Sequence, residues 1–526
     1  MLDVKINLYN TLGKNVQEFV PNEAGKVGMY TCGPTVYHYA HIGNLRTYIM
    51  EDVLEKTLRF VGYDVKRVMN ITDVGHLSSD GDTGEDKMLA GAKREHKTVM
   101  EIAQYYTDCF KNDACALNIR WPEYVEPATN CIADFIEMIE VLLKKDFAYV
   151  AGDNVYFDTS KLKDYYVLSA QNEEELVVGA RDDVEEDTNK RNKADFVLWF
   201  TKSKFENQEL KWESPWGLGY PGWHIECSCI SKKHLGEYLD IHCGGVDNIF
   251  PHHTNEIAQS ESYFGHKWCN YWFHVNHLNT SSGKMAKSAG GFLTVQSLVE
   301  KGYDPMVYRL FCLQSHYRKP LEFSFEALDN VAAAYDKLIA RLKRLVSTDD
   351  TKKFAENALS EIMSFCDSDS DRGTQSIDSS KVCGRGPCHS QSGVVPDGVD
   401  ATTYSEYEMK FAEALANDIN TSSALTILYD ALKADTDDKT KIALVLRFDQ
   451  VLSIGLSSAF DPSACGDESG NDVDEELSAF VEQKIAERAD AKKNKDFTTA
   501  DAIRDELLEK GIVLKDTREG TTWERV

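Results

Sequence analysis

Residues 32–48, CGPTVYHYAHIGNLRTY, place a cysteine, two histidines and two glycines just ahead of a helical pattern. Backbone N–H groups and the helix dipole favour an anion where a helix begins. His41 at that position can hydrogen-bond a phosphate, and Gly43 leaves room for an adenine ring. Taken alone, the tetrad HIGN at 41–44 is equally compatible with an ordinary helix cap.

A second candidate for phosphate chemistry is SSGKMAKSAGG, residues 281–291. Its two lysines, Lys284 and Lys287, lie three residues apart in a segment rich in serine and glycine. Such a flexible cationic clamp suits a leaving pyrophosphate, whose developing charge it would stabilise. The alternative is a surface loop with two solvated lysines.

A metal site is indicated by PHHTNEIAQSESYFG, residues 251–265. We expect Pro251 in the first turn of a helix, which puts His252 and Glu256 four residues apart on one face. Together with Cys32, and with either Cys227 or Cys229 upstream, they offer the mixture of donors that suits zinc. A capping histidine followed by a solvent-facing glutamate is the alternative.

The elements that must position these residues alternate between strand and helix. Residues 27–36 are predicted to be a strand that stops at Gly33-Pro34, residues 41–62 a helix ending at Gly62, and residues 63–72 a second strand. This order is typical of the βαβ unit that opens a nucleotide-binding fold.

Further along, helical spacing covers 98–118 and 128–145, and short strands with acidic loops follow over 148–215. The strand–helix alternation resumes from residue 217 to 278. After Pro320 the pattern is helical, with helices expected at 325–346, 410–416, 421–433 and 441–455. Two polar segments, 366–402 and 464–476, lack hydrophobic periodicity, and we expect the first to be a mobile loop. Cys383 and Cys388 within it are read as two solvent-facing thiols rather than metal ligands.

Composition limits the class of protein. A chain of 526 residues exceeds one hydrophobic core, and its N-terminus shows no signal-peptide pattern and no membrane span, which points to the cytoplasm. Thirteen cysteines without regular spacing are expected to be mostly free thiols. The net charge of −28 argues against nonspecific nucleic-acid coating but leaves a specific nucleic-acid partner open.

Together the motifs resemble those of class I aminoacyl-tRNA synthetases, and more narrowly the cysteinyl-tRNA synthetase family. HIGN and KMAKS (284–288) are similar to the two signatures of the class. The narrower resemblance rests on CGPTVY at 32–37, the segment 212–228, FPHHTNEIAQ at 250–259, NDINTSSAL at 417–425 and the C-terminal GIVLKDTREGTTW.

The resemblance implies an α/β fold: a Rossmann-type doubly wound parallel-sheet catalytic domain with an insertion, then an all-α anticodon-side domain and a small C-terminal unit. It implies catalytic halves at 1–125 and 216–290, a connective insertion at 126–215, and a stem-contact region at 291–335. It also implies a helical tRNA-binding domain at 336–463 and an anticodon-recognition unit at 473–526.

The resemblance also implies residue roles. The zinc ligands, one ion per chain, fall on Cys32, Cys227, His252 and Glu256. The catalytic and phosphate roles fall on His41, Asn44, Lys284 and Lys287, and the ATP-binding roles on Gly43, Asp247 and Lys287. Substrate-binding roles fall on Thr35, Thr72, Trp223 and His242. Asn44 and Ala286 replace a histidine and a serine of the family signatures. Neither change removes a charge that the mechanism needs, but each loses a polar contact and could slow activation.

The expected activity is the ATP- and Mg²⁺-dependent activation of L-cysteine and its transfer to tRNA(Cys) by a cytoplasmic monomer. One rival is a mycothiol-pathway type of ligase that joins cysteine to a small amine, although the C-terminal half argues for tRNA. The other rival is an inactive nucleic-acid-binding scaffold, which would not need His41, Lys284 and Lys287.

Overall fold

The strands β3 (Lys26–Thr31) and β4 (Asp64–Ile71) are parallel neighbours joined by the helix α1 (Ile42–Val61), as the sequence predicts. The computed structural model describes residues 2–74, 98–169, 187–202, 210–280, 283–284, 293–368, 395–460 and parts of 484–525. Two compact units divide the chain, residues 1–460 and 461–526.

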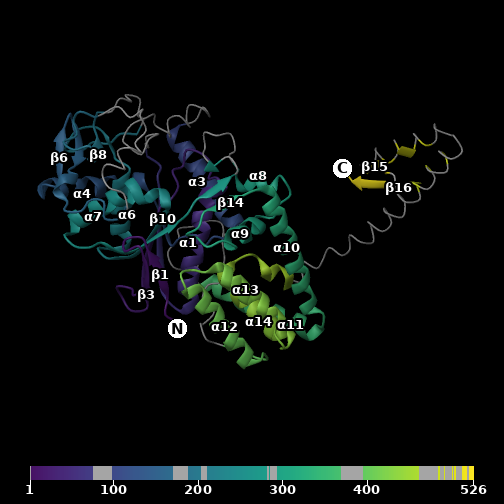
Figure 1. Ribbon diagram of the computed structural model, residues 1–526. Coiled ribbons are helices and arrows are strands. Elements are labelled where there is room, and N and C mark those ends of the chain that lie inside the picture. Colours follow the sequence, from purple (N-terminus) through teal and green to yellow (C-terminus); the bar gives the residue numbers. More distant parts are fainter. Residues whose placement is uncertain are drawn as a thin grey trace. The chain divides into compact units, whose positions relative to one another are not determined.

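A five-stranded sheet in the order β11-β10-β3-β4-β5 forms the centre of the first unit, and every neighbouring pair is parallel (Figure 1). Its other members are β5 (Tyr124–Pro127), β10 (Leu239–Gly245) and β11 (Cys269–Val275). Strand order reverses between β3 and β10, which makes this the topological switch point of a doubly wound sheet. The predicted Rossmann-type fold is confirmed.

The bounds of α1 follow from its two caps. The His41 side chain accepts a hydrogen bond from the Asn44 backbone N–H, and the Asn44 side chain accepts one from the His41 N–H. At the other end Gly62 adopts a left-handed conformation with φ of 112°, which glycine reaches without steric cost. HIGN is therefore a helix cap, whatever further role His41 has.

Helices cover both faces of the sheet. Met29 and Val65 pack with the apolar face of α1 in one core, whereas Tyr30 and Val68, one residue out of phase, pack in another with α4 (Ile132–Lys144) and α6 (His224–Leu235). The period of two along each strand explains this division.

Apart from the sheet strand β5, residues 99–221 hold the elements between β4 and α6. A four-stranded antiparallel sheet has the order β6-β7-β8-β9. The elements are α3 (Val99–Ala116), β6 (Ala148–Ala151), β7 (Asn154–Phe157), β8 (Phe196–Phe200), β9 (Tyr220–Pro221) and the 3-10 turns η1 (Ala128–Cys131) and η2 (Thr159–Lys161). The N-terminal hairpin of β1 (Asn7–Asn10) and β2 (Asn15–Glu18) was not predicted.

Beyond β11, a small mixed sheet has the order β13-β12-β14. Its strands are β12 (Leu278–Thr280), β13 (Gly283–Lys284) and β14 (Leu321–Phe323). The helices that follow are α8 (Val295–Val299), α9 (Pro305–Leu313), α10 (Phe325–Lys343), α11 (Asp349–Ser368), α12 (Ala401–Ala416), α13 (Thr421–Lys433) and α14 (Asp438–Leu452), with 3-10 turns η5 (Arg344–Val346) and η7 (Leu456–Phe460). The four helices predicted after Pro320 are present.

The boundaries expected for the segment 366–402 are wrong at both ends. The helix α11 continues to Ser368, and α12 begins at Ala401, where the Asp400 side chain accepts hydrogen bonds from the N–H groups of Thr402 and Thr403. An aspartate N-cap of this kind starts a helix without any apolar pattern before it. Residues 369–394, with Cys383 and Cys388, and residues 464–476 lie outside the described residues.

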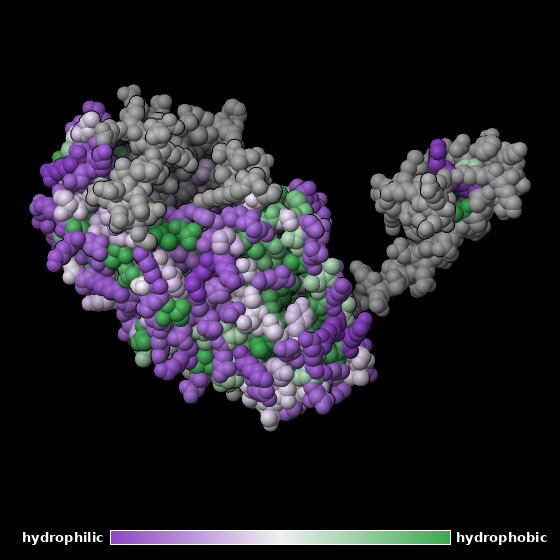
Figure 2. Space-filling view, viewed as in Figure 1, coloured by the Kyte–Doolittle hydropathy of each residue, from purple (hydrophilic) through white to green (hydrophobic). Residues whose placement is uncertain are grey.

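The second unit contains an antiparallel hairpin of β15 (Ile512–Thr517) and β16 (Gly520–Arg525). On the first unit, hydrophilic side chains cover most of the described surface on the face in Figure 2, with small scattered apolar patches. No helix in the part of the chain that the structure describes is long and apolar enough to span a membrane.

Candidate functional site

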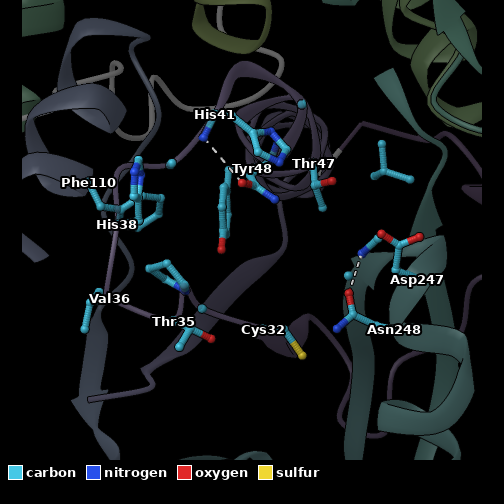
Figure 3. A pocket seen from close by; sticks show the side chains of 18 of the residues that line it. Cys32, Thr35, Val36, His38, His41, Thr47, Tyr48, Phe110, Asp247 and Asn248 are labelled. Atoms are coloured by element: carbon cyan, nitrogen blue, oxygen red, sulfur yellow. Dashed lines mark hydrogen bonds between the residues drawn. The ribbon is translucent and has the colours of Figure 1, made fainter. Parts of the chain in front are cut away.

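A cavity of ≈ 350 Å³ opens beyond the carboxyl ends of β3, β10 and β11, at the switch point of the sheet (Figure 3). Among its lining residues, Cys32 follows β3, His41 and Gly43 begin α1, and Asp247 follows β10. This edge is where open α/β sheets bind ligands. HIGN and the cysteine of CGPTVY therefore open into one cavity.

Four predicted metal ligands meet beside this cavity. Suitable donor atoms of Cys32, Cys227, His252 and Glu256 all lie within 4.8 Å of one another. The Cys32 and Cys227 sulfurs are 4.0 Å apart, the Cys227 sulfur is 3.4 Å from His252 Nε2, and His252 Nε2 is 3.0 Å from Glu256 Oε1. Of the two candidate cysteines upstream, Cys227 belongs to this group and Cys229 does not. The Cys229 sulfur lies near Asp134 and Met138 instead.

The local backbone around His252 differs in part from the prediction. Phe250 has an extended conformation (φ −140°, ψ 133°), Pro251 lies in the π-helical segment η4 (Ile249–His253), and the regular helix α7 (Thr254–Phe264) begins only afterwards. Pro251 is thus the first residue of the helical run that continues into α7, as expected for a first-turn proline, since a residue before proline avoids helical geometry. The sequence did not indicate that this first turn is π-helical. His252 and Glu256 still share one face.

His253 is a neighbour of this cluster that the sequence analysis did not single out. Its Nε2 is 3.2 Å from the Cys32 sulfur, its Nδ1 is 2.8 Å from His274 Nε2, and Thr11 Oγ1 lies 2.7 Å from His274 Nδ1. A second candidate metal-ligand group, with all its donor atoms within 4.8 Å of one another, consists of Cys32, His242, His253 and Glu256. The two adjacent histidines of PHHTNE could have drawn attention to His253. Its contact with His274 could not be predicted, because the two residues belong to separate elements.

The first group fits a tetrahedral ion well. Zinc bonds of about 2.3 Å to sulfur and about 2.0–2.1 Å to nitrogen and oxygen give a tetrahedron with edges of roughly 3.3–3.8 Å. The observed separations of 4.0, 3.4 and 3.0 Å straddle that range. Glu256 Oε1 lies 3.0 Å from His252 Nε2, and the other oxygen of this carboxylate accepts from His242. A buried carboxylate and a histidine grouped with two thiols form a donor set that a zinc ion would satisfy.

The charges of these buried groups depend on one another. Burial raises the pKa of Cys32, and the neighbouring Cys227 raises it further. Burial also raises the pKa of Cys227, but hydrogen bonds to Cys32 and His252 and the charge of His252 outweigh it and lower that pKa to about 6. Burial opposes the charge on Glu256 too, yet electrostatic interactions and hydrogen bonds with His242 and His252 outweigh it and lower the pKa of Glu256 to about 2. Two adjacent thiolates and a carboxylate need a cation to be ionised together.

The other predicted pocket residues divide into two sets. Thr35, Trp223 and Asp247 line the cavity, and Asp247 Oδ1 is 3.0 Å from His277 Nε2. Thr72 and His242 do not belong to the lining. The Thr72 hydroxyl donates to Glu226 at 2.6 Å, and His242 Nε2 is 2.8 Å from Glu256 Oε2.

The structure describes the HIGN motif in full and the KMAKS motif only in part. His41, Gly43 and Asn44 line the cavity at the start of α1. Lys284 belongs to β13, where its backbone pairs with Asn279 of β12. Lys287 lies outside the described residues, so the two lysines stay predicted phosphate contacts.

Comparisons with known proteins identify the family of this chain. Residues 18–333 match the family of the "tRNA synthetases class I (C) catalytic domain", and residues 474–523 match the "Cysteinyl-tRNA ligase anticodon binding domain". The solved ternary complex of Agrobacterium radiobacter K84 agnB2 LeuRS-tRNA-LeuAMS is similar in fold, with a TM-score of 0.52 at 10% identity over 84% of this chain and 85% of that one. The parallel sheet, its switch-point cavity and the matched catalytic domain thus define a class I tRNA synthetase.

The relatives narrow the class further. A cysteine–tRNA ligase of Treponema denticola is 43% identical over 526 residues, which cover 99% of this chain and 100% of the relative. One of Borrelia hermsii is 39% identical over 522 residues, covering 99% of each. This chain belongs to the cysteine–tRNA ligase family, and the resemblance seen in its sequence is confirmed.

Proposed function

We propose that this protein activates L-cysteine with ATP, releasing pyrophosphate, and transfers the cysteinyl group from the adenylate to the 3′ end of tRNA(Cys). The observation that carries the proposal is the convergence of Cys32, Cys227, His252 and Glu256 beside a cavity that His41 and Gly43 also line. The metal-ligand set would thus receive the amino acid, and the N-terminus of α1 would receive the phosphates of ATP, at the same cavity. Membership of the cysteine–tRNA ligase family supports both steps.

The four-ligand cluster selects the substrate in this proposal. Cysteine, serine and alanine differ too little in size for a hydrophobic pocket to separate them well. One zinc ion bound by Cys32, Cys227, His252 and Glu256 would supply a Lewis acid that prefers a thiolate to a hydroxyl. Cys227 and Cys32 hold the ligand set at the cavity floor, and Trp223 closes the wall beside His252.

The remaining residues align ATP and stabilise charge. His41 binds phosphate oxygens where the dipole of α1 favours an anion, Gly43 gives the nucleotide close approach, and Asp247 binds the adenosine. Asn44 holds His41 in its cap. Lys284 and Lys287 stabilise the leaving pyrophosphate together with Mg²⁺. Thr35 and Thr72 support the wall on the side of the amino acid.

The tRNA, the compartment and the oligomeric state complete the proposal. The matched anticodon-binding domain at 474–523 supports recognition of tRNA(Cys) by the C-terminal unit. We infer a monomer that works in the cytoplasm, and light scattering after size-exclusion chromatography tests the first of these. Joining cysteine to a small amine is not favoured, because the relatives and the C-terminal match both point to tRNA.

The decisive experiment is the charging of total tRNA with labelled cysteine, with labelled serine alongside, before and after treatment with a zinc chelator. We expect cysteine-specific charging that the chelator abolishes and that added zinc restores. Cysteine-dependent pyrophosphate exchange without charging would favour the small-amine reaction. If both activities were absent, the inactive scaffold would be correct.

A further inference from the structure

Arg46 is a fully buried cation whose hydrogen bonds all go to backbone carbonyl groups. Its NH1 donates to the carbonyl oxygens of Asn276 at 2.8 Å and His277 at 2.5 Å, and its NH2 to those of Lys319 at 2.7 Å and His316 at 3.4 Å. The side chain has 0% exposure. Among the described residues, no carboxylate forms an ion pair with it.

Two other arginines are fully buried in the part of the chain that the structure describes, and both have carboxylate partners. Arg67 lies 3.1 Å from Glu55, and Arg309 lies 2.6 Å from Asp52. Burying a cation without a counter-ion is costly, and burial lowers the pKa of Arg46 accordingly. A contribution to stability therefore does not explain why an arginine occupies this position. The need to hold the bound carbonyl groups in a fixed geometry does explain it.

Two of the four carbonyl groups that Arg46 binds, those of Asn276 and His277, belong to a wall of the cavity. Asn276, His277 and Leu278 line it, directly after β11. His277 contacts Asp247, the expected adenosine ligand, at 3.0 Å. His41 and Gly43 precede Arg46 at the start of α1 and also line the cavity. In Figure 3 His41 lies at the start of this helix and Asp247 lies to the right of it, after β10. Arg46 thus joins the α1 side of the cavity to the wall that carries His277.

The start of α1 contacts the same region at two further points. The N–H of Ile42 donates to the carbonyl oxygen of Leu293 at 2.8 Å, and a Cβ added at Gly43 would lie 3.7 Å from the Leu278 side chain. The Tyr308 hydroxyl in turn donates to the Ile42 carbonyl at 2.6 Å. The start of α1 is therefore hydrogen-bonded to Leu293 and lies close to Leu278, the first residue of β12, and Arg46 supplies the most extensive hydrogen bonding to this region.

We propose that Arg46 is a positioning residue for the reaction: by binding the carbonyl groups of Asn276 and His277 it sets the distance between the phosphate-binding start of α1 and the His277–Asp247 wall that receives the nucleotide. The inference rests on the proposed function. Lysine cannot replace the planar guanidinium, since an ammonium group is a point charge on a flexible stem and cannot span four fixed carbonyl oxygens.

The test compares Arg46→Lys with Arg309→Lys. Arg309 is equally buried and donates to the Leu452 and Leu117 carbonyl groups, but it lies outside the cavity lining. For the full-length chain and both variants we would measure the melting temperature, the bound zinc, the kcat and KM of cysteine-dependent pyrophosphate exchange, and the affinity for a non-hydrolysable ATP analogue.

Arg46→Lys is expected to keep its zinc and its KM for cysteine, to weaken binding of the ATP analogue and to lower kcat roughly tenfold or more, because small misplacements of reacting groups are costly. Arg309→Lys is expected to lose a similar amount of thermal stability with kcat and ATP affinity near wild type. Equal kinetic losses in both variants, or none in Arg46→Lys, would overturn the proposal. If the wild-type chain bound the analogue but catalysed no exchange, the proposed function would fail, and weaker analogue binding in Arg46→Lys alone would still support the role of Arg46.

Discussion

The indole ring of Trp223 stacks on the imidazole of His252, with ring centroids 4.2 Å apart and planes inclined by 23°. Trp223 lines the cavity, whereas His252 is almost wholly buried behind it and faces Cys227 and Glu256. The stack therefore fixes the ring plane of one expected metal ligand from the substrate side. A change at Trp223 should alter the binding of the amino acid before it alters the fold.

We expect Trp223→Ala to raise the KM for cysteine about two- to tenfold, because an aromatic pair contributes about 0.5–1.5 kcal/mol beyond its buried area. Trp223→Phe keeps a stacking ring and should lie close to wild type. Pyrophosphate exchange at varied cysteine concentration measures the effect. An unchanged KM in the alanine variant would exclude a role for the stack in cysteine binding.

Cys32 and Cys229 provide a matched pair for the metal site. Cys32→Ser should lower the bound zinc and raise the KM for cysteine together, since a hydroxyl is a poor zinc ligand. Cys229→Ser changes a buried cysteine on the same helix as Cys227, but one that contacts Asp134 and Met138, and should keep a full complement of zinc. Metal analysis and exchange kinetics measure both. Full zinc with normal cysteine affinity in Cys32→Ser would contradict the ligand assignment.

His242 holds one oxygen of Glu256 at 2.8 Å and leaves the other facing Cys227 and His252. His242→Gln should therefore weaken zinc binding about 10–100-fold, the usual cost of removing a partner that orients a metal ligand. His234→Gln is the control, because His234 contacts Glu126 at 2.9 Å away from the cluster. Competition against a chelator of known affinity gives both values, and equal values would refute the orienting role.

Local features of the fold were predictable because their causes are local. His41 and Gly62 bound α1 through a cap and a left-handed residue, and the four-residue spacing of His252 and Glu256 defines one helix face. The shortened 366–402 segment and the irregular turn at Pro251 were missed, because an aspartate cap and an extended residue leave little trace in hydrophobic periodicity.

Long-range contacts were not predictable from spacing. The choice of Cys227 over Cys229 came from the family resemblance, and in the structure it depends on which side of α6 faces β3. His253 meets Cys32 and His274 through three separate elements, and Arg46 meets carbonyl groups more than two hundred residues away in sequence. Every residue carries a backbone carbonyl group, so the sequence does not show which of them accept hydrogen bonds from Arg46.

Glu51 gives a prediction of stability against pH. It lies on α1 with 1% exposure, and neither carboxylate oxygen has a hydrogen-bond partner in the structure. Burial raises its pKa to about 8, although the charge of Arg67 opposes the shift. Between its ordinary pKa of 4.5 and about 8, the folded state keeps a proton that the unfolded state loses. The free energy of unfolding should therefore fall as the pH rises through that window and level off above it.

Glutamine at position 51 does not titrate, so Glu51→Gln removes this dependence on pH. The free energy of unfolding of the variant relative to wild type should therefore increase from pH 5 to pH 9, by an amount on the order of a few kcal/mol. Glu55→Gln is the control of opposite sign. Burial opposes the charge on Glu55, but Arg67, Arg59 and Arg120 outweigh it and lower its pKa, so its ionised form stabilises the fold above pH 4.5 and that contribution is lost in acid. Its glutamine variant should be less stable than wild type at pH 7 and 9. Urea unfolding at pH 5, 7 and 9 measures all three proteins, and a difference between Glu51→Gln and wild type that did not change with pH would show that Glu51 is ionised in the fold.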